Sequence, residues 1–156
     1  MYWQMEHLKR LAGKIILVDK EKYEKALLEV ALVKKFWQAE IEYFSNAEEA
    51  LMYLKKTEDK VFLVISEMNL GGMNGLNFKK KIDADPILLK KAIPFIFAST
   101  SANNQEVKDA YDYRVQGYFK KPNTIEDHAE LLDLIIRYWI HSRHPNDKVI
   151  VDADPN

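Results

Sequence analysis

The sequence predicts an α/β fold in which a parallel β-sheet is covered by helices on both faces. Short, continuously apolar segments at KIILV (14–18), KVFLVIS (60–66) and IPFIFAS (93–99) are typical of strands that are buried on both sides. Longer segments with helical periodicity lie between them, so that strand and helix alternate five times along the chain. This alternation indicates strands joined by helical crossovers.

The first half of the chain contains two predicted strand–helix pairs. A helix over 21–37 follows the first strand, and the alternating segment AEIEYF (39–44) predicts a second strand. The apolar face of the first helix is predicted from side chains near a 3.6-residue spacing: Tyr23, Leu27, Val30 and Val33. Ser45 and Asn46 are good N-caps for a second helix over 47–56.

The second half of the chain contains three more pairs. The predicted strands cover 60–66, 93–99 and 115–121, and the predicted helices cover 76–85, 103–114 and 124–142. Pro86 is expected to stop the first of these helices, and Thr124 is a suitable cap for the last. A glycine-rich loop, residues 67–75, separates the central strand from the helix that follows it.

Three regions are predicted. An N-terminal extension, 1–12, is expected to form a helical turn that packs on the domain, with a partner-docking helix as the alternative. The folded domain covers 13–142. The tail, 143–156, is expected to hold a short strand at 148–151.

Composition excludes several classes of protein. A length of 156 residues suits one domain, and 47% hydrophobic residues can form a sizeable core. A net charge of −1 does not indicate a nucleic-acid binder. The absence of cysteine excludes disulfides, zinc–thiolate sites and a cysteine nucleophile. No apolar run is long enough to span a membrane, and the N-terminus does not resemble a signal peptide, so a cytoplasmic location is expected.

Polar residues follow four of the predicted strands at their carboxyl ends. In an open parallel sheet, ligands bind at this edge. The residues that collect there are Asp19 and Lys20, Glu67 and Asn69, Ser99 and Thr100, and Lys120, Lys121 and Pro122. Carboxylates of this kind can bind a divalent cation, and a lysine with a hydroxyl can bind phosphate oxygens.

These residues stand in the segments ILVDK, VISEMN, GGMNGL, FAST and GYFKKP. In order and spacing the segments resemble the motifs of response regulator receiver domains, including single-domain chemotaxis regulators, over about residues 13–141. The resemblance implies a flavodoxin-like, doubly wound (βα)5 three-layer sandwich with strand order 2-1-3-4-5. It also implies a role in a two-component phosphorelay, with a histidine kinase or phosphotransfer protein upstream and a protein target downstream.

The resemblance assigns a role to each matched position. Glu67 stands at the phosphoacceptor position, where the family has aspartate. Ser99 matches the switch hydroxyl, Tyr118 the aromatic switch residue and Lys121 the phosphate-binding lysine. Asp19 matches the first residue of an acidic pair, whose second position is occupied here by Lys20.

The two changed positions have physical consequences. Glutamate moves the carboxylate outward by about 1 Å, which misplaces it for in-line transfer but brings it toward the place of a phosphoryl oxygen. The metal ligands Asp19, Glu67 and Asn69 would form a degenerate set, because Lys20 places a cation where Mg²⁺ needs a ligand. Mg²⁺ is therefore expected to bind weakly, and no other cofactor is expected. Lys20 is predicted to neutralise Asp19 and Glu67, with an ordinary surface lysine as the alternative.

The first functional hypothesis is a stand-alone receiver-like module that is not an enzyme and is not efficiently phosphorylated. Only residues 143–156 follow the last predicted helix, so output is expected through protein contacts rather than DNA binding, and a homodimer is compatible with the sequence. The expected contact surface is formed by the fourth helix, the fifth strand and the fifth helix. It carries Lys108, Tyr111, Asp112, Tyr113, Tyr118 and Lys120, although helix packing explains some of its tyrosines equally well.

Two alternatives stay open. Glu67 could be a Mg²⁺-dependent phosphoacceptor with Lys20 turned aside. The chain could also be a flavodoxin-like binder of a small anionic ligand. The loop DKEKYE after the first strand argues against the second alternative, because it lacks the small residues that hold phosphate through backbone N–H groups.

Overall fold

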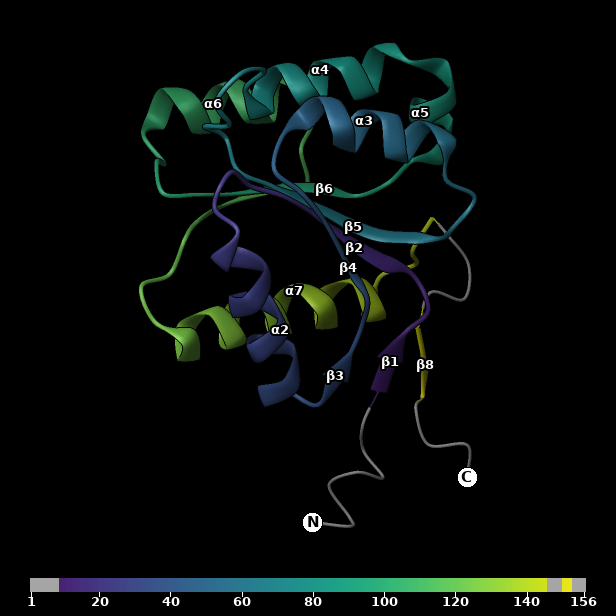
Figure 1. The fold of residues 1–156 in the computed structure, drawn as a ribbon, viewed down its shortest axis with the longest axis vertical. Helices are drawn as coiled ribbons and strands as arrows, with labels where there is room; N and C mark the ends of the chain where they lie inside the picture. Colours follow the sequence, from purple (N-terminus) through teal and green to yellow (C-terminus); the bar gives the residue numbers. More distant parts are fainter. Residues whose placement is uncertain (1–8, 146–149, 153–156) are drawn as a thin grey trace.

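The structure is a computed structural model that describes residues 9–145 and 150–152. A five-stranded sheet lies at its centre, with helices α3, α4, α5 and α6 on one face and α2 and α7 on the other (Figure 1). The strand order is β4-β2-β5-β6-β7, and every neighbouring pair is parallel. This is the predicted order 2-1-3-4-5, so the predicted flavodoxin-like fold is confirmed.

The bounds of the elements follow the sequence patterns closely. The strands of the central sheet are β2 (Lys14–Val18), β4 (Ile41–Phe44), β5 (Val61–Ser66), β6 (Phe95–Ser99) and β7 (Gly117–Lys120). The helices are α2 (Tyr23–Lys34), α3 (Ala47–Lys56), α4 (Gly75–Ala84), α5 (Pro86–Lys91), α6 (Asn104–Asp112) and α7 (Ile125–His141). Side-chain oxygens of Asn46 and Thr124 accept hydrogen bonds from the backbone of Glu49 and Asp127, as expected of N-caps.

Helix α5 was not predicted, because Pro86 was interpreted only as the end of the preceding helix. Proline also suits the first position of a helix, where its missing N–H removes no hydrogen bond. Asp85 caps the new helix by accepting hydrogen bonds from the N–H groups of Ile87 and Leu88. The chain therefore stops one helix and starts another at the same proline.

The N-terminal prediction was wrong in the part that the structure describes. Residues 1–8 of the expected helical turn lie outside the described residues, and Lys9–Leu11 form a strand, β1. This strand pairs in parallel with β3 (Trp37–Gln38) and antiparallel with β8 (Ile150–Asp152), which makes a second, three-stranded sheet. β1 and β3 extend the pairing of β2 and β4 after short interruptions, so backbone pairing prevails over the apolar helical pattern. Of the strand expected at 148–151, residues 148–149 lie outside the described part.

The apolar face of α2 was also predicted incorrectly. Leu28, Ala31 and Leu32 are buried, whereas Tyr23 is 59% exposed and Val33 72% exposed. The buried residues follow the i, i+3, i+4 spacing that faces a sheet, one position away from the predicted stripe. The helix also ends earlier than predicted, because Phe36 adopts a positive φ of 61° and the chain enters β3.

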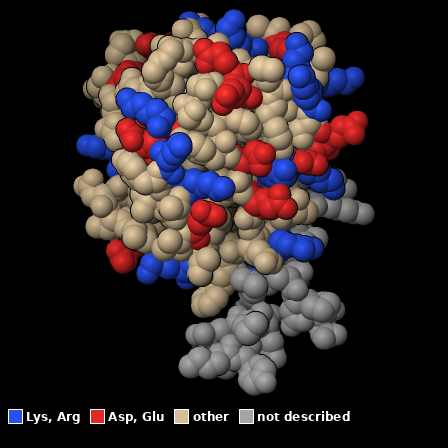
Figure 2. Space-filling model, viewed as in Figure 1, with Lys and Arg blue, Asp and Glu red and all other residues tan. Residues whose placement is uncertain are grey.

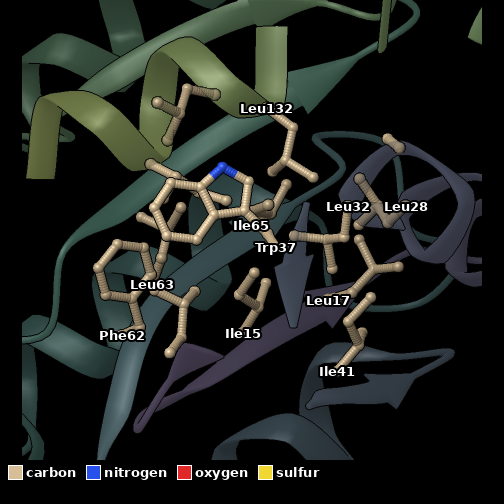
Figure 3. Close-up of a cluster of buried hydrophobic side chains, with 14 of the residues drawn as sticks. Ile15, Leu17, Leu28, Leu32, Trp37, Ile41, Phe62, Leu63, Ile65 and Leu132 are labelled. Carbon is tan, nitrogen blue, oxygen red and sulfur yellow. The ribbon is translucent and has the colours of Figure 1, made fainter. Parts of the chain in front are cut away.

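One hydrophobic cluster fills the layer between the sheet and helices α2 and α7. Figure 3 shows Trp37 in this cluster, close to Ile65 and Leu63 of the central strand. The Trp37 indole N–H donates a hydrogen bond of 3.1 Å to Asp133 of α7. The other face of the sheet has its own cluster, in which the rings of Phe78, Phe95 and Phe97 make edge-to-face contacts. Both faces are therefore packed, and the polar site lies at the strand ends.

Candidate functional site

Four strands deliver the predicted site residues to one edge of the sheet. Asp19 follows β2, Glu67 follows β5, Ser99 ends β6 and Lys121 follows β7. Asp19, Glu67 and Ser99 are each at least 97% buried. The structure thus brings together these four of the residues that the sequence assigned to this edge.

The Lys121 ammonium lies at the centre of the site. Its Nζ is 2.6 Å from Asp19 Oδ2, 3.1 Å from Glu67 Oε1 and 3.4 Å from Glu24 Oε1. All four side chains are at most 9% exposed. Lys121 donates its hydrogen bond to Asp19, and Glu67 and Glu24 add their negative charge beside the same ammonium.

The Glu67 carboxylate is surrounded by donors. Oε2 accepts hydrogen bonds from the backbone N–H groups of Met68 at 2.6 Å and Asn69 at 3.2 Å. Oε1 accepts a longer bond of 3.4 Å from the backbone N–H of Thr100 and also faces Lys121. The side chain therefore curls back over its own loop and joins the ends of β5, β6 and β7.

The charges of the site shift its pKa values in different directions. Burial alone would raise the pKa of Glu67, but hydrogen bonds from Ser99 and Asn69 and the charge of Lys121 outweigh burial and lower it. Burial also opposes the charged form of Lys121, yet Asp19, Glu67 and Glu24 raise its pKa above the usual value. For Asp19, burial prevails over Lys121 and raises the pKa. Glu67 and Lys121 are thus held as an ion pair.

Ser99 and Tyr118 connect the site to the loop after β6. The Ser99 hydroxyl accepts a hydrogen bond of 3.1 Å from the Ser101 N–H. Tyr118 is half-buried against Phe97, with ring centroids 5.5 Å apart, and its hydroxyl donates a bond of 2.6 Å to the Ser101 carbonyl. Burial raises the pKa of Tyr118, which keeps this hydroxyl a donor. Tyr118 therefore points inward and holds the loop.

We expect Tyr118→Phe to lower the free energy of unfolding by about 1 kcal/mol, because one hydrogen bond to the loop is lost while the ring packing stays. Urea denaturation measures this change. The control is Tyr111→Phe, since Tyr111 is 51% exposed and its substitution should have little effect. Equal stabilities of the two variants would contradict the role given to the Tyr118 hydroxyl.

The predicted counter-ion Lys20 does not take that place. Lys20 is exposed and makes no ion pair with Asp19 or Glu67 among the described residues. The chain turns sharply after Asp19, whose Oδ1 accepts a bond from the Glu21 N–H, so the Lys20 side chain faces solvent. The counter-charge belongs to Lys121, and Lys20 fits the alternative reading of a surface lysine. Asn69 is likewise exposed and contributes its backbone N–H.

Comparison with known proteins decides the family. A family model described as "Response regulator receiver domain" matches residues 15–135, which is most of the chain. The chain belongs to the response regulator receiver family. The predicted recognition and its place in two-component signalling are therefore confirmed at the level of the family.

Relatives of this receiver domain include proteins of Vibrio cholerae and Arabidopsis thaliana. It is 33% identical over 98 residues to chemotaxis protein CheY-3 of Vibrio cholerae, covering 59% of this chain and 72% of that protein. It is 27% identical over 124 residues to the two-component response regulator ARR14 of Arabidopsis thaliana, covering 80% of this chain but only 31% of the plant protein. A crystal structure of the phosphorylated cyanobacterial phytochrome response regulator RcpA has a TM-score of 0.73 at 26% identity, covering 83% of this chain and 95% of that one.

Receiver domains imply a bound Mg²⁺, and the residues of this receiver fit such an ion poorly. Among the residues that the structure describes, no group of three or more His, Cys, Asp or Glu side chains is arranged to hold a metal ion. The Lys121 ammonium already lies within 3.1 Å of oxygens of Asp19 and Glu67, and the second acidic position is a lysine.

Glu24 is the site residue that sequence reasoning missed. It lies in the first turn of α2 and is 6% exposed, with its carboxylate facing Lys121. A signal was present, because Glu24 precedes the buried residues Leu28 and Ala31 by four and seven positions. The incorrect rotation assigned to this helix hid the signal, since it placed Tyr23 on the inner face.

Gly75 positions the loop that carries Glu67. A Cβ atom at this position would lie 2.5 Å from the Glu67 carbonyl oxygen and 2.6 Å from a ring carbon of Phe97. The Gly75 N–H also donates a bond of 2.8 Å to the Met68 carbonyl, which closes the loop. The glycine is therefore required by the close approach of two backbone segments.

The expected output surface is only partly open. Tyr111 is 51% exposed, whereas Tyr118 points inward. The Lys80 ammonium lies over the ring of Tyr113, 4.8 Å from its centroid, in a cation–π contact. Lys108 pairs with Asp112 at 3.9 Å on the outside of α6.

Acidic and basic side chains alternate over the face in Figure 2 without a one-sided basic patch there. Among the described residues, no helix is long and apolar enough to cross a membrane.

Proposed function

We propose that this receiver domain acts as a signalling module whose switch is held by its own glutamate rather than set by a phosphoryl group. The single observation that carries this proposal is the set of donors around the Glu67 carboxylate. Lys121 and the N–H groups of Met68, Asn69 and Thr100 all face it. Donors of these kinds stabilise a phosphoryl anion at a strand edge. Here the Glu67 carboxylate already interacts with them.

The position of the switch residues supports the same proposal. Ser99 is fully buried beside Glu67, and Tyr118 points inward with its hydroxyl on the Ser101 carbonyl. An anion at the site draws Ser99 inward, which leaves room for Tyr118 to point inward as well. A permanent anion therefore favours the arrangement of the loop after β6 in which Tyr118 points inward over the one in which it points outward. We therefore propose that Glu67 biases this loop toward the inward arrangement without an incoming signal.

The proposed partners are proteins. A histidine kinase or phosphotransfer protein upstream and a protein target downstream fit a member of this family, and the surface around α6, β7 and α7 is the proposed contact. We propose no role in binding nucleic acid or membranes, a cytoplasmic location, no enzymatic turnover and at most weak binding of Mg²⁺. A small anionic ligand fits the site poorly, because three carboxylates surround its central ammonium.

The test is incubation with acetyl phosphate and Mg²⁺, read by intact mass. We expect no phosphoryl adduct on the natural chain, because Glu67 is displaced for in-line attack and Lys121 is occupied. The Lys20→Asp/Glu67→Asp double variant restores the family's acids and should gain the adduct. An adduct on the natural chain that maps to Glu67 would overturn the proposal in favour of a glutamate phosphoacceptor.

A further inference from the structure

Glu24 adds a third carboxylate to a site whose family motifs do not include it. It comes from helix α2, whereas Asp19, Glu67 and Lys121 follow strands of the sheet. An acid in the first turn of a helix is commonly explained by the helix dipole, and such acids usually face solvent. Glu24 is instead 6% exposed and directed at Lys121 from 3.4 Å. The helix dipole alone does not account for that burial.

The ammonium of Lys121 faces three carboxylates. Its Nζ donates a hydrogen bond of 2.6 Å to Asp19 and forms ion pairs with Glu67 at 3.1 Å and Glu24 at 3.4 Å. Asp19 and Glu67 follow strands that build the site. Glu24 adds a third negative charge beside the ammonium, from the side of helix α2.

We propose, on the basis of the function proposed above, that Glu24 is an internal inhibitor of phosphoryl transfer that keeps Lys121 from a phosphoryl donor. In transfer from acetyl phosphate, a carboxylate oxygen at position 67 bonds to phosphorus while the bond between phosphorus and the acetyl oxygen breaks, and acetate leaves with the electron pair. Negative charge on the transferring oxygens needs the Lys121 ammonium. Glu24 holds that ammonium and repels the incoming dianion, so it is a positioning residue that acts through Lys121.

One consequence is that restoring the family's acids restores reactivity only in part. The Lys20→Asp/Glu67→Asp double variant, called here the restored background, still has Glu24 on Lys121. Adding Glu24→Gln keeps the size of the side chain and removes its charge. We expect this third change to raise the rate of phosphorylation by acetyl phosphate and Mg²⁺ about tenfold, because one negative charge no longer attracts the Lys121 ammonium or repels the dianion.

The matched control is Glu29→Gln in the same background. Glu29 lies on the same helix, is exposed and undergoes the same change of charge. A rate gain that is equal in both triple variants would reflect net charge alone and would overturn the proposal. The proposal would also be overturned if Glu24→Gln did not raise the rate of phosphorylation of the restored background. The same holds if the restored background is not phosphorylated with or without Glu24.

A second readout is independent of phosphoryl transfer. In the otherwise natural chain, limited acetylation of amines with acetic anhydride, followed by peptide mass mapping, reports how firmly Lys121 is held. We expect Glu24→Gln, but not Glu29→Gln, to increase acetylation of Lys121 about tenfold. Unchanged acetylation would show that Glu24 does not hold Lys121 and would overturn the inference. A phosphoryl adduct on the natural chain would show that the proposed function itself is wrong. That outcome is separate from unchanged acetylation of Lys121, which would overturn only the role of Glu24.

Discussion

Replacing Lys121 with methionine should lower the free energy of unfolding by about 3–5 kcal/mol at neutral pH, because removing one partner of a buried ion pair leaves uncompensated charge. Here the loss is shared by three carboxylates, those of Asp19, Glu24 and Glu67, all buried around one ammonium. Methionine keeps much of the length and apolar volume of lysine, so that the charge is the main change. Denaturation in urea at pH 7 measures the effect.

The matched control is Lys120→Met. Lys120 precedes Lys121 in the sequence but is exposed, and no ion pair joins it to another described residue. Its replacement should change the free energy of unfolding by at most about 0.5 kcal/mol. Similar losses in the two variants would contradict the central place given to Lys121.

The stability that Lys121 and Glu67 contribute to the folded state depends on pH with a definite sign. The raised pKa of Lys121 contributes stability that is complete below its usual value of 10.5 and is lost as the pH rises through the folded-state pKa. The lowered pKa of Glu67 contributes stability that is present above its usual value of 4.5 and is lost as the pH falls. The two contributions therefore overlap between pH 4.5 and 10.5.

In the Lys121→Met variant the carboxylates lose their counter-charge, so their folded-state pKa values should rise. A carboxyl group whose folded-state pKa is raised becomes less destabilising as the pH falls. The deficit of the variant should therefore shrink as the pH is lowered from 7 toward the ordinary carboxyl range near 4. A deficit that is constant over this interval would contradict the electrostatic origin of the loss.

Gly75→Ala should destabilise the domain by about 1–3 kcal/mol, the range for forcing extra volume into a packed site. The added Cβ would meet the Glu67 carbonyl oxygen at 2.5 Å and Phe97 at 2.6 Å, and neither atom belongs to the free end of a flexible chain. Relief requires the loop that carries Glu67 to move. Amide NMR signals of Met68, Asn69 and Thr100 should therefore shift in the folded variant.

Gly72→Ala is the control in the same loop. A Cβ atom at Gly72 would meet only a carboxylate oxygen of Glu48 at 3.6 Å, which is an ordinary contact. Its substitution should change the free energy of unfolding by about 1 kcal/mol or less, and in the stabilising direction where the backbone tolerates alanine. A larger loss for Gly72→Ala than for Gly75→Ala would contradict the close approach described here.

The sequence predicts the fold well because its strands are short, apolar and regularly separated by helices. β2 and α3 match their predicted bounds, since a continuous apolar run and a capped helix each have a clear local pattern. The short strand β1 could not be predicted in this way. Its formation depends on β3 and β8, which are distant in the sequence and become its neighbours only in the folded chain.

The sequence correctly predicts those site residues whose positions are set by the end of a strand. Asp19, Glu67, Ser99 and Lys121 meet as expected because the carboxyl ends of parallel strands share one edge. Glu24 and Lys20 were misjudged because their directions depend on the rotation of α2 and on the turn after Asp19. Charge alone made Lys20 the natural counter-ion, but the backbone turns its side chain to solvent and Lys121 takes the place.

The most direct test of the account is the pKa of Glu67, measured by a carbon-13 NMR titration of its side-chain carboxyl and assigned with Glu67→Gln. If Lys121 and the surrounding N–H groups hold this carboxylate as a fixed anion, it should titrate below the usual value of 4.5. The amides of Met68 and Asn69 should follow the same transition, because both donate to its Oε2. A carboxyl that titrates at or above 4.5, with amides that do not respond, would contradict a switch held by glutamate.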